Sequence, residues 1–236
     1  LFGRILNERT LNAINRFFKD TIIYGIAAVL PRAVNIVLVK LHTNTLASEK
    51  YAENTIYFVY AAYFNALLTY GMETAFFRFF TKEKEKGRVV STSFISLVTT
   101  TLLFFAVMYF FSDQLTSYFG FSNPLYLKIL IAVTTLDTLV VLPYAYLRVT
   151  NRPIRFMLFK VLNILIYAFF NLYFLWYVPH ALDQGGYVPE FIARGFSEHP
   201  LVLYIFVANL LASAATFLLL LPTLLKFKMT FDRRLL

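Results

Sequence analysis

Long apolar runs place the tightest limit on what this chain can fold into. Six of them are about 20 residues or longer, which is the length that an α-helix needs to cross the hydrocarbon core of a bilayer. They cover approximately residues 20–41, 54–77, 89–112, 125–147, 156–178 and 200–225. Backbone groups cannot stay unpaired in lipid, and the runs lack the strict alternation of barrel strands. We therefore predict an all-α fold, a polytopic membrane helical bundle with six transmembrane helices.

The composition is typical of a membrane protein, and it excludes disulfides and thiolate metal sites. Hydrophobic residues make up 59% of the 236 residues and charged residues 15%. The mean hydropathy of +0.64 is too high for an ordinary soluble domain. Because the chain has no cysteine, it has neither disulfides nor thiolate metal ligands. The net charge of +9 fits either a nucleic-acid partner or a basic membrane face, and the positions of the charges separate these two interpretations.

The basic residues gather at one set of helix ends. Sixteen lie before the first run, after the second, after the fourth and after the sixth, whereas only Lys50 and Arg194 lie in the opposite loops. The sixteen are Arg4, Arg9, Arg16, Lys19, Arg78, Lys82, Lys84, Lys86, Arg88, Arg148, Arg152, Arg155, Lys226, Lys228, Arg233 and Arg234. Under the positive-inside rule, this asymmetry places both termini of the segment in the cytoplasm. Membrane topology alone accounts for the charge, so we expect no nucleic-acid partner.

Two short segments flank the predicted six-helix lobe of residues 20–225. Residues 1–19 place charges between apolar residues at Phe2, Ile5, Leu6, Leu11, Ile14, Phe17 and Phe18. This pattern fits a cytoplasmic amphipathic helix in the membrane plane, and it equally fits a tail that lengthens the first span. Residues 226–236 are predicted to form a cytoplasmic basic tail, or a linker to a second lobe.

Polar residues recur at helical spacing along the apolar runs. Such stripes either join helices at close contacts or line a hydrated cavity. By run, the residues that share such a face are Thr21, Gly25, Ala28, Arg32, Asn35 and Val39 on the first; Asn65, Thr69 and Glu73 on the second; Thr134 and Asp137 on the fourth; Lys160, Asn163, Tyr167, Asn171 and Phe174 on the fifth; and Asn209, Ser213, Thr216 and Thr223 on the sixth. The candidate substrate-binding residues in a cavity are Arg32, Asn35, Asn65, Lys160, Asn163, Tyr167 and Asn209.

Two ionisable residues, Arg32 and Asp137, lie deep within the runs. A central arginine costs about 2.5–3.5 kcal/mol on insertion scales, so it persists mainly where it faces protein or water. In one interpretation Arg32 lines a cavity, where its permanent charge and forked donors suit phosphate oxygens. In the other it forms a structural ion pair with Asp137 or Glu73. Asp137, Glu73 and Arg78 are therefore candidates for ion pairing or ion coupling.

The sequence shows no residue pattern that is typical of a catalytic or metal-binding site. The three histidines, His42, His180 and His199, fall in the less basic loops without the spacing of metal ligands. The chain has no nucleotide-binding glycine-rich loop, nucleophile elbow or HExxH motif. We therefore expect no enzyme activity, no cofactor and no metal site.

Three separated segments resemble one known family. They read "FKDTIIYGIAAVLPRAVNIVLVKLHTNTLASEKY", "LLTYGMETAFFRFF" and "LPYAYLRVTNRPIRFMLFKVLNILIYAFFNLYFL". In this order and spacing, the chain is similar over most of its length to the polysaccharide-biosynthesis proteins, the O-antigen flippase-like branch of the multidrug/oligosaccharidyl-lipid/polysaccharide exporter superfamily.

The resemblance implies a flippase of the bacterial inner membrane. Such a transporter moves undecaprenyl-diphosphate-linked oligosaccharide from the inner to the outer leaflet by alternating access, for the synthesis of lipopolysaccharide and other surface polysaccharides, with coupling to a Na⁺ or H⁺ gradient. Arg32 corresponds to a basic residue in the first helix of the family that is thought to receive the diphosphate. Glu73 and Arg78 fill the pattern G-x-[DE]-x-A-x-x-R, which serves either as a structural clasp or as part of a site.

The chain departs from the family in two respects. The segment "KYAEN" lacks the glycine of a Tyr-Gly step before the second helix, and the chain has six spans where the family has twelve to fourteen. We therefore expect the N-terminal lobe of a two-lobe exporter, with a second six-helix lobe as its partner. The alternatives are a cation-coupled multidrug exporter of the same superfamily, a membrane-embedded glycosyl- or acyltransferase, and a non-transport membrane assembly subunit.

Overall fold

The described part of the protein is helical throughout. A computed structural model describes the backbone of residues 2–226 and 230–232, and the side chains of residues 14, 15, 17–226 and 230–232. The elements are α1 (Phe2–Thr45), α2 (Ser48–Thr69), α3 (Met72–Lys82), α4 (Lys86–Phe110), α5 (Ser112–Phe119), α6 (Pro124–Leu139), α7 (Val141–Val149), α8 (Pro153–Leu172), the π-helix η1 (Tyr173–Tyr177), α9 (Val178–Asp183), α10 (Glu190–Glu198) and α11 (Leu203–Leu224).

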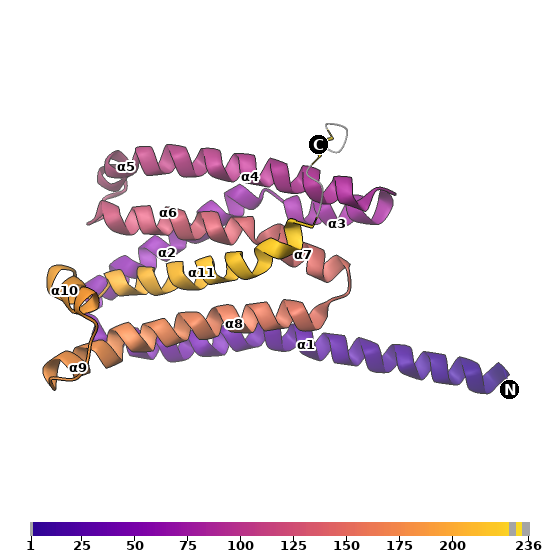
Figure 1. Cartoon of the computed structure of the whole chain (residues 1–236), viewed down its shortest axis with the longest axis horizontal. Helices are drawn as coiled ribbons and strands as arrows, with labels where there is room; N and C mark the ends of the chain where they lie inside the picture. Colours follow the sequence, from indigo (N-terminus) through magenta and orange to yellow (C-terminus); the bar gives the residue numbers. More distant parts are fainter. Residues whose placement is uncertain (1, 227–229, 233–236) are drawn as a thin grey trace.

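The long helices lie roughly along one axis, with successive helices running in opposite senses, and form a bundle with two distinct ends (Figure 1). The short helices α5, α9 and α10 lie at one end, and the α3–α4 and α7–α8 turns lie at the other, which we call the basic end. Helix α1 packs on α8, α8 on α11, α11 on α6, and α6 on both α2 and α4. Helices α1 and α2 meet mainly near the turn that joins them, so they diverge toward the basic end.

Five helical segments in the described part are long and apolar enough to cross a membrane. They are Phe17–Thr45, Lys86–Phe110, Pro124–Val149, Pro153–Asp183 and Leu203–Leu224. Helix α2 has 22 residues, but its asparagines, tyrosines and carboxylates keep it out of this group. An all-helical fold with five candidate membrane spans is thus confirmed for the described part, whereas the sixth span stays a prediction.

The second predicted run, residues 54–77, is not one helix. Helix α2 begins at Ser48 and ends at Thr69, because Tyr70 and Gly71 adopt left-handed backbone angles with φ of 32° and 74°. Helix α3 then starts at Met72 in a new direction. A left-handed glycine is the common way to end a helix, so "TYG" marks a boundary that the apolar pattern hides.

The fourth predicted run also divides, into α6 and α7, at Val140. Pro143 has no backbone N–H and cannot bond to the carbonyl of Leu139, which explains an interruption at this point. The two parts still form a single candidate span, Pro124–Val149.

The first run is longer than predicted. Helix α1 continues without a break from Phe2 to Thr45, which is the geometry of a tail that lengthens the first span. Its N-terminal part projects beyond the end of α8 (Figure 1). The side chains of Phe2, Ile5, Leu6 and Leu11 lie outside the described set, as do residues 227–229 and 233–236 of the predicted tail.

Aromatic packing closes the less basic end of the bundle. Tyr57 of α2, Tyr126 of α6 and Phe206 of α11 form a buried cluster, with 5.1 Å between the ring centroids of Tyr126 and Phe206. Ring pairs at this separation stabilise a contact beyond the area that they bury. The cluster fixes α2 against α6 and α11, and therefore fixes the angle at which α2 leaves α1.

Candidate functional site

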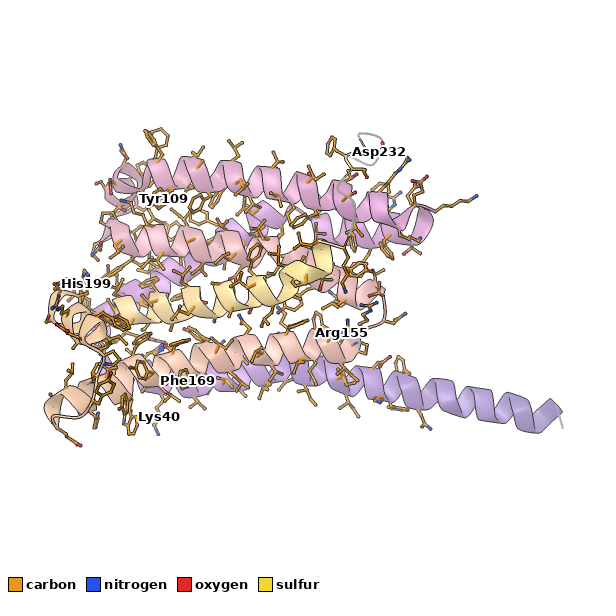
Figure 2. All side chains as sticks on the ribbon, in the orientation of Figure 1. Lys40, Tyr109, Arg155, Phe169, His199 and Asp232 are labelled. Atoms are coloured by element: carbon orange, nitrogen blue, oxygen red, sulfur yellow. The ribbon has the colours of Figure 1, made fainter. Side chains whose placement is uncertain are left out.

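Three adjoining cavities lie between the diverging helices α1 and α2, above a floor made by α6, α8 and α11. The first and second share Pro31 and Asn163, and the second and third share Phe58 and Asn209. Because neighbouring cavities share lining residues, they follow one another along a single groove. Figure 2 shows side chains filling the bundle on both sides of α11, so these cavities, rather than the gaps between ribbons, are the open space.

The largest of the three, which we call the basic cavity, has a volume of about 790 Å³. This volume falls within the range of roughly 300–1,000 Å³ that is usual for small-molecule sites. Its lining residues are Tyr24, Ala27, Ala28, Pro31, Arg32, Phe77, Arg148, Asn151, Phe156, Lys160 and Asn163. Three of them are cationic, and no carboxylate belongs to the described lining.

The three cations differ in what balances them. Arg148 forms an ion pair with Glu73 and lies 5.1 Å from the ring centroid of Phe77. The Nζ of Lys160 lies 4.4 Å from the ring centroid of Tyr144, and its charge interacts with that of Asp137. Both are thus partly neutralised by neighbouring side chains.

Arg32 is different, because it makes no ion pair with any described residue. The alternative of a structural pair with Asp137 or Glu73 is not what the structure shows, since Glu73 binds Arg148 and Asp137 binds Ser213. Arg32 is exposed on the open side of the groove, and its charge is therefore available to a ligand.

The second cavity, which we call the amide cavity, has a volume of about 470 Å³. It is lined by Pro31, Asn35, Leu38, Val39, His42, Tyr51, Asn54, Thr55, Phe58, Asn163, Ile164, Tyr167 and Asn209. None of these carries a permanent charge. The buried Oδ1 of Asn54 has no hydrogen-bond partner in the described structure, so an acceptor is ready for a ligand or a water.

The sequence-based prediction that His42 lies in a loop is wrong. His42 lies in the last turn of α1, because the helix continues past residue 41, and it is 6% exposed. Its Nε2 lies 2.8 Å from Oδ1 of Asn171, whose own amide donates to the carbonyl of Tyr167. This pair joins α1 to α8 at the closed end of the groove.

The third cavity, which we call the carboxylate cavity, has a volume of about 420 Å³ and contains the one acidic residue among the described lining of the three. The Oγ of Ser213 donates to Oδ1 of Asp137 at 2.7 Å. The buried Oγ1 of Thr134, one turn before Asp137, has no partner. The full lining is Phe58, Ala61, Ala62, Asn65, Ala66, Val133, Thr134, Asp137 and Asn209.

The structure brings the predicted cavity residues together. Arg32, Asn35, Asn65, Lys160, Asn163, Tyr167 and Asn209 all line one or two of the three cavities. Asn163 also joins two helices, because its amide donates to Thr216 Oγ1 at 2.9 Å. Arg78 is exposed on α3 and lines none of the described cavities.

Arg148 and Asn54 are among the polar lining residues that sequence reasoning missed. Arg148 was counted with the basic loops, and nothing in its local pattern separates it from Arg152 or Arg155. Asn54 lies at the start of the second run, where it resembles a loop residue. The fold brings Arg148 into the basic cavity through its pair with Glu73, and it buries Asn54 against α1.

No protein-family model matches the chain, and no curated protein matches it closely enough to count as similar. Solved structures do share its fold. An outward-facing multidrug resistance MATE family transporter of the MOP superfamily aligns with a TM-score of 0.70 and 15% identity, over 93% of this chain and 49% of its own. A MOP superfamily transporter from Pyrococcus furiosus, described by the reverse polarity of its binding pocket, aligns with a TM-score of 0.61 and 18% identity, over 94% and 47%.

These alignments show the fold and its extent. The chain spans about half the length of both structures, and it has the fold of one half of a MOP superfamily transporter. Together with the five apolar spans, they support a multi-pass membrane protein. They show the fold alone and do not distinguish the branches of the superfamily named in the resemblance.

Proposed function

We propose that this chain is one lobe of an exporter that moves undecaprenyl-diphosphate-linked oligosaccharide from the inner to the outer leaflet of a bacterial inner membrane. The observation that carries the proposal is the basic cavity, where Arg32, Arg148 and Lys160 meet without a carboxylate among the described lining residues. A diphosphate holds the permanent negative charge of such a lipid, and guanidinium groups bind phosphate oxygens two at a time.

Within the basic cavity, Arg32 is the main anchor for the diphosphate. Arg148 is engaged by Glu73, and Lys160 is partly balanced by Asp137, whereas Arg32 has no described ionic partner. An unpaired guanidinium near the middle of a span is costly, so a ligand that neutralises it binds with a large gain.

The neighbouring amide cavity suits the first sugars. Its lining offers uncharged hydrogen-bonding groups, such as Asn35, Asn54 and Asn209, next to the rings of Tyr51 and Tyr167. Sugar hydroxyls pair with such groups, and sugar faces pack on aromatic rings. Because the two cavities share Pro31 and Asn163, a diphosphate at Arg32 places an attached sugar in the amide cavity.

A cation-coupled multidrug exporter is the second candidate, and one observation favours it. Asp137 provides a carboxylate in the third cavity, and one structure of similar fold is described as a multidrug resistance transporter. Such an exporter binds its cationic substrate at a carboxylate and gains nothing from Arg32. The charge of the largest cavity favours the flippase.

The experiment measures surface polysaccharide in cells that depend on this protein. We expect Arg32→Ala to abolish export while the protein remains inserted, and Arg32→Lys to restore part of it, since the charge returns without the fork. Arg78→Ala is the matched control, because Arg78 is exposed and lines no described cavity.

Two outcomes would contradict the proposal. Full export with Arg32→Ala would show that the diphosphate does not bind in the basic cavity. Efflux of a cationic dye that is lost with Asp137→Asn and kept with Arg32→Ala identifies the drug exporter instead.

A further inference from the structure

A fourth cavity lies apart from the groove between α1 and α2, at the basic end. Its volume is about 570 Å³, and it lies where α1 passes the N-terminus of α8. It is lined by Asn15, Lys19, Asp20, Ile23, Asn151, Arg152, Pro153, Ile154 and Arg155. We call it the interface cavity. Asn151 also lines the basic cavity, so the two are neighbours.

Charge and backbone geometry make this cavity a site for an anion. Lys19, Arg152 and Arg155 contribute three cations, against one carboxylate, that of Asp20. The first backbone bond of α8 runs from Phe156 N–H to the carbonyl of Arg152. The N–H groups of Ile154 and Arg155 precede it and point out of the helix end, where the helix dipole favours negative charge.

The depth of the cavity identifies the source of the anion. Two candidate spans begin here, Phe17–Thr45 and Pro153–Asp183, so Lys19 and Arg152 lie at the level where the apolar core of a membrane gives way to headgroups. Arg155 lies at this end of α8, beside the α7–α8 turn (Figure 2). The phosphate of a lipid in the adjoining leaflet lies at this level.

Apolar surface continues from the cavity toward the membrane core. Ile22 and Ile26 of α1 and Ile154 and Leu158 of α8 are all exposed. They follow the cationic residues on the same two helices, so acyl chains can lie along them while the headgroup occupies the cavity. A soluble phosphate has no acyl chains and therefore makes no contact with this apolar surface.

We propose that the interface cavity binds the phosphate headgroup of an anionic phospholipid, with its acyl chains along α1 and α8. Basic pockets between transmembrane helices at the headgroup level bind anionic lipids in this way. The proposal does not depend on the substrate of the basic cavity.

The test uses the full chain, purified in a mild detergent and depleted of lipid. Phosphatidylglycerol should raise its melting temperature, and native mass spectrometry should show one retained molecule. Phosphatidylcholine and inorganic phosphate at the same concentration should do neither. The double variant Arg152→Gln, Arg155→Gln should bind phosphatidylglycerol at least about tenfold more weakly than the parent, because each basic residue near the headgroups adds attraction.

Matched variants separate this site from general charge and from the proposed transport site. Lys82→Gln, Lys84→Gln removes two exposed cations at the same end that line no described cavity, and it should keep full lipid binding. Arg32→Ala should also keep it, although export is lost. Equal stabilisation by inorganic phosphate, or unchanged lipid binding by the Arg152, Arg155 double variant with its helical content intact, would overturn the proposal.

Discussion

Lys160 and Asp137 connect two cavities of opposite charge. Lys160 lines the basic cavity, Asp137 lines the carboxylate cavity, and the two charges interact across α6 and α8. An anion that draws Lys160 toward the basic cavity leaves Asp137 less neutralised and therefore a better ligand for a cation. By reciprocity, a cation at Asp137 strengthens the binding of the anion. We expect this pair to link the binding of an anion in one cavity to the binding of a cation in the other.

The hydroxyl of Thr134 tests whether that cation is Na⁺. Its Oγ1 is buried and unpartnered, and Thr134 lines the same cavity as Asp137. Na⁺ in transporters is held by oxygen ligands. We expect NaCl, compared with choline chloride, to raise the melting temperature of the parent chain, and Thr134→Val to remove at least half of this rise. Because the hydroxyl makes no hydrogen bond, stability without Na⁺ should change by less than about 1 kcal/mol.

Thr135→Val is the control for that measurement. Its Oγ1 is also buried and unpartnered, yet Thr135 does not line the carboxylate cavity. It should respond to NaCl as the parent does. An equal response from the Thr134 variant excludes its hydroxyl as a ligand, and no response from the parent excludes Na⁺ from the carboxylate cavity under these conditions.

At the scale of elements, helix breaks decide where the charges meet. Tyr70 and Gly71 end α2, and α3 then carries Glu73 to Arg148 of α7. A second helix continued straight through residue 77, as the apolar pattern predicts, has no reason to direct Glu73 toward α7. The break therefore assembles one wall of the basic cavity.

Gly71→Ala should weaken the fold at this break. Gly71 has a φ of 74°, and no atom lies within 4 Å of the position that a Cβ would take. The cost is therefore conformational, and we expect a loss of about 1 kcal/mol in the free energy of unfolding, measured by titration with a denaturing detergent.

Gly25→Ala gives the comparison of opposite sign. Gly25 lies within α1, and a Cβ there also meets open space. The alanine should raise stability by about 0.5–1 kcal/mol, because it restricts the unfolded chain. Equal effects of both substitutions would show that the left-handed angle at Gly71 does not hold the break.

What was predictable at this scale follows from the physics of each signal. Helical spacing placed Arg32, Asn35 and Asn163 on cavity walls, because the 3.6-residue period persists through a long apolar helix. Hydropathy did not locate the end of α1, so His42 was taken for a loop residue. The position of Arg148 in the basic cavity depends on its ion pair with Glu73, which is distant in sequence, so the local sequence around Arg148 does not predict it.

At the scale of the whole molecule, no described part of the chain covers the groove between α1 and α2. Both structures of similar fold are about twice as long as this chain. Exposed apolar residues such as Val29 and Ile36 of α1 stand beside the exposed Arg32. A second lobe that faces the groove would enclose the basic cavity and leave these apolar residues against its own helices or lipid.

The orientation of the bundle determines the leaflet from which a lipid reaches the basic cavity. The basic end holds the α3–α4 and α7–α8 turns, so the positive-inside rule predicts that it faces the cytoplasm. We expect a single cysteine at Lys84, in the α3–α4 turn, to react with an impermeant maleimide in inside-out vesicles alone. A single cysteine at Gln184, after α9, should react in right-side-out vesicles alone.

The absence of native cysteine makes this labelling decisive, since the parent chain gives no background. Helices α1 and α2 diverge toward the basic end, and both the basic and interface cavities lie on that side. If Lys84→Cys labels from inside, an inner-leaflet lipid meets the interface cavity first and the basic cavity next. The reverse labelling pattern would place Arg32 nearer the outer leaflet, where a lipid that starts on the inner leaflet has no direct access, and it would contradict the proposed direction of transport.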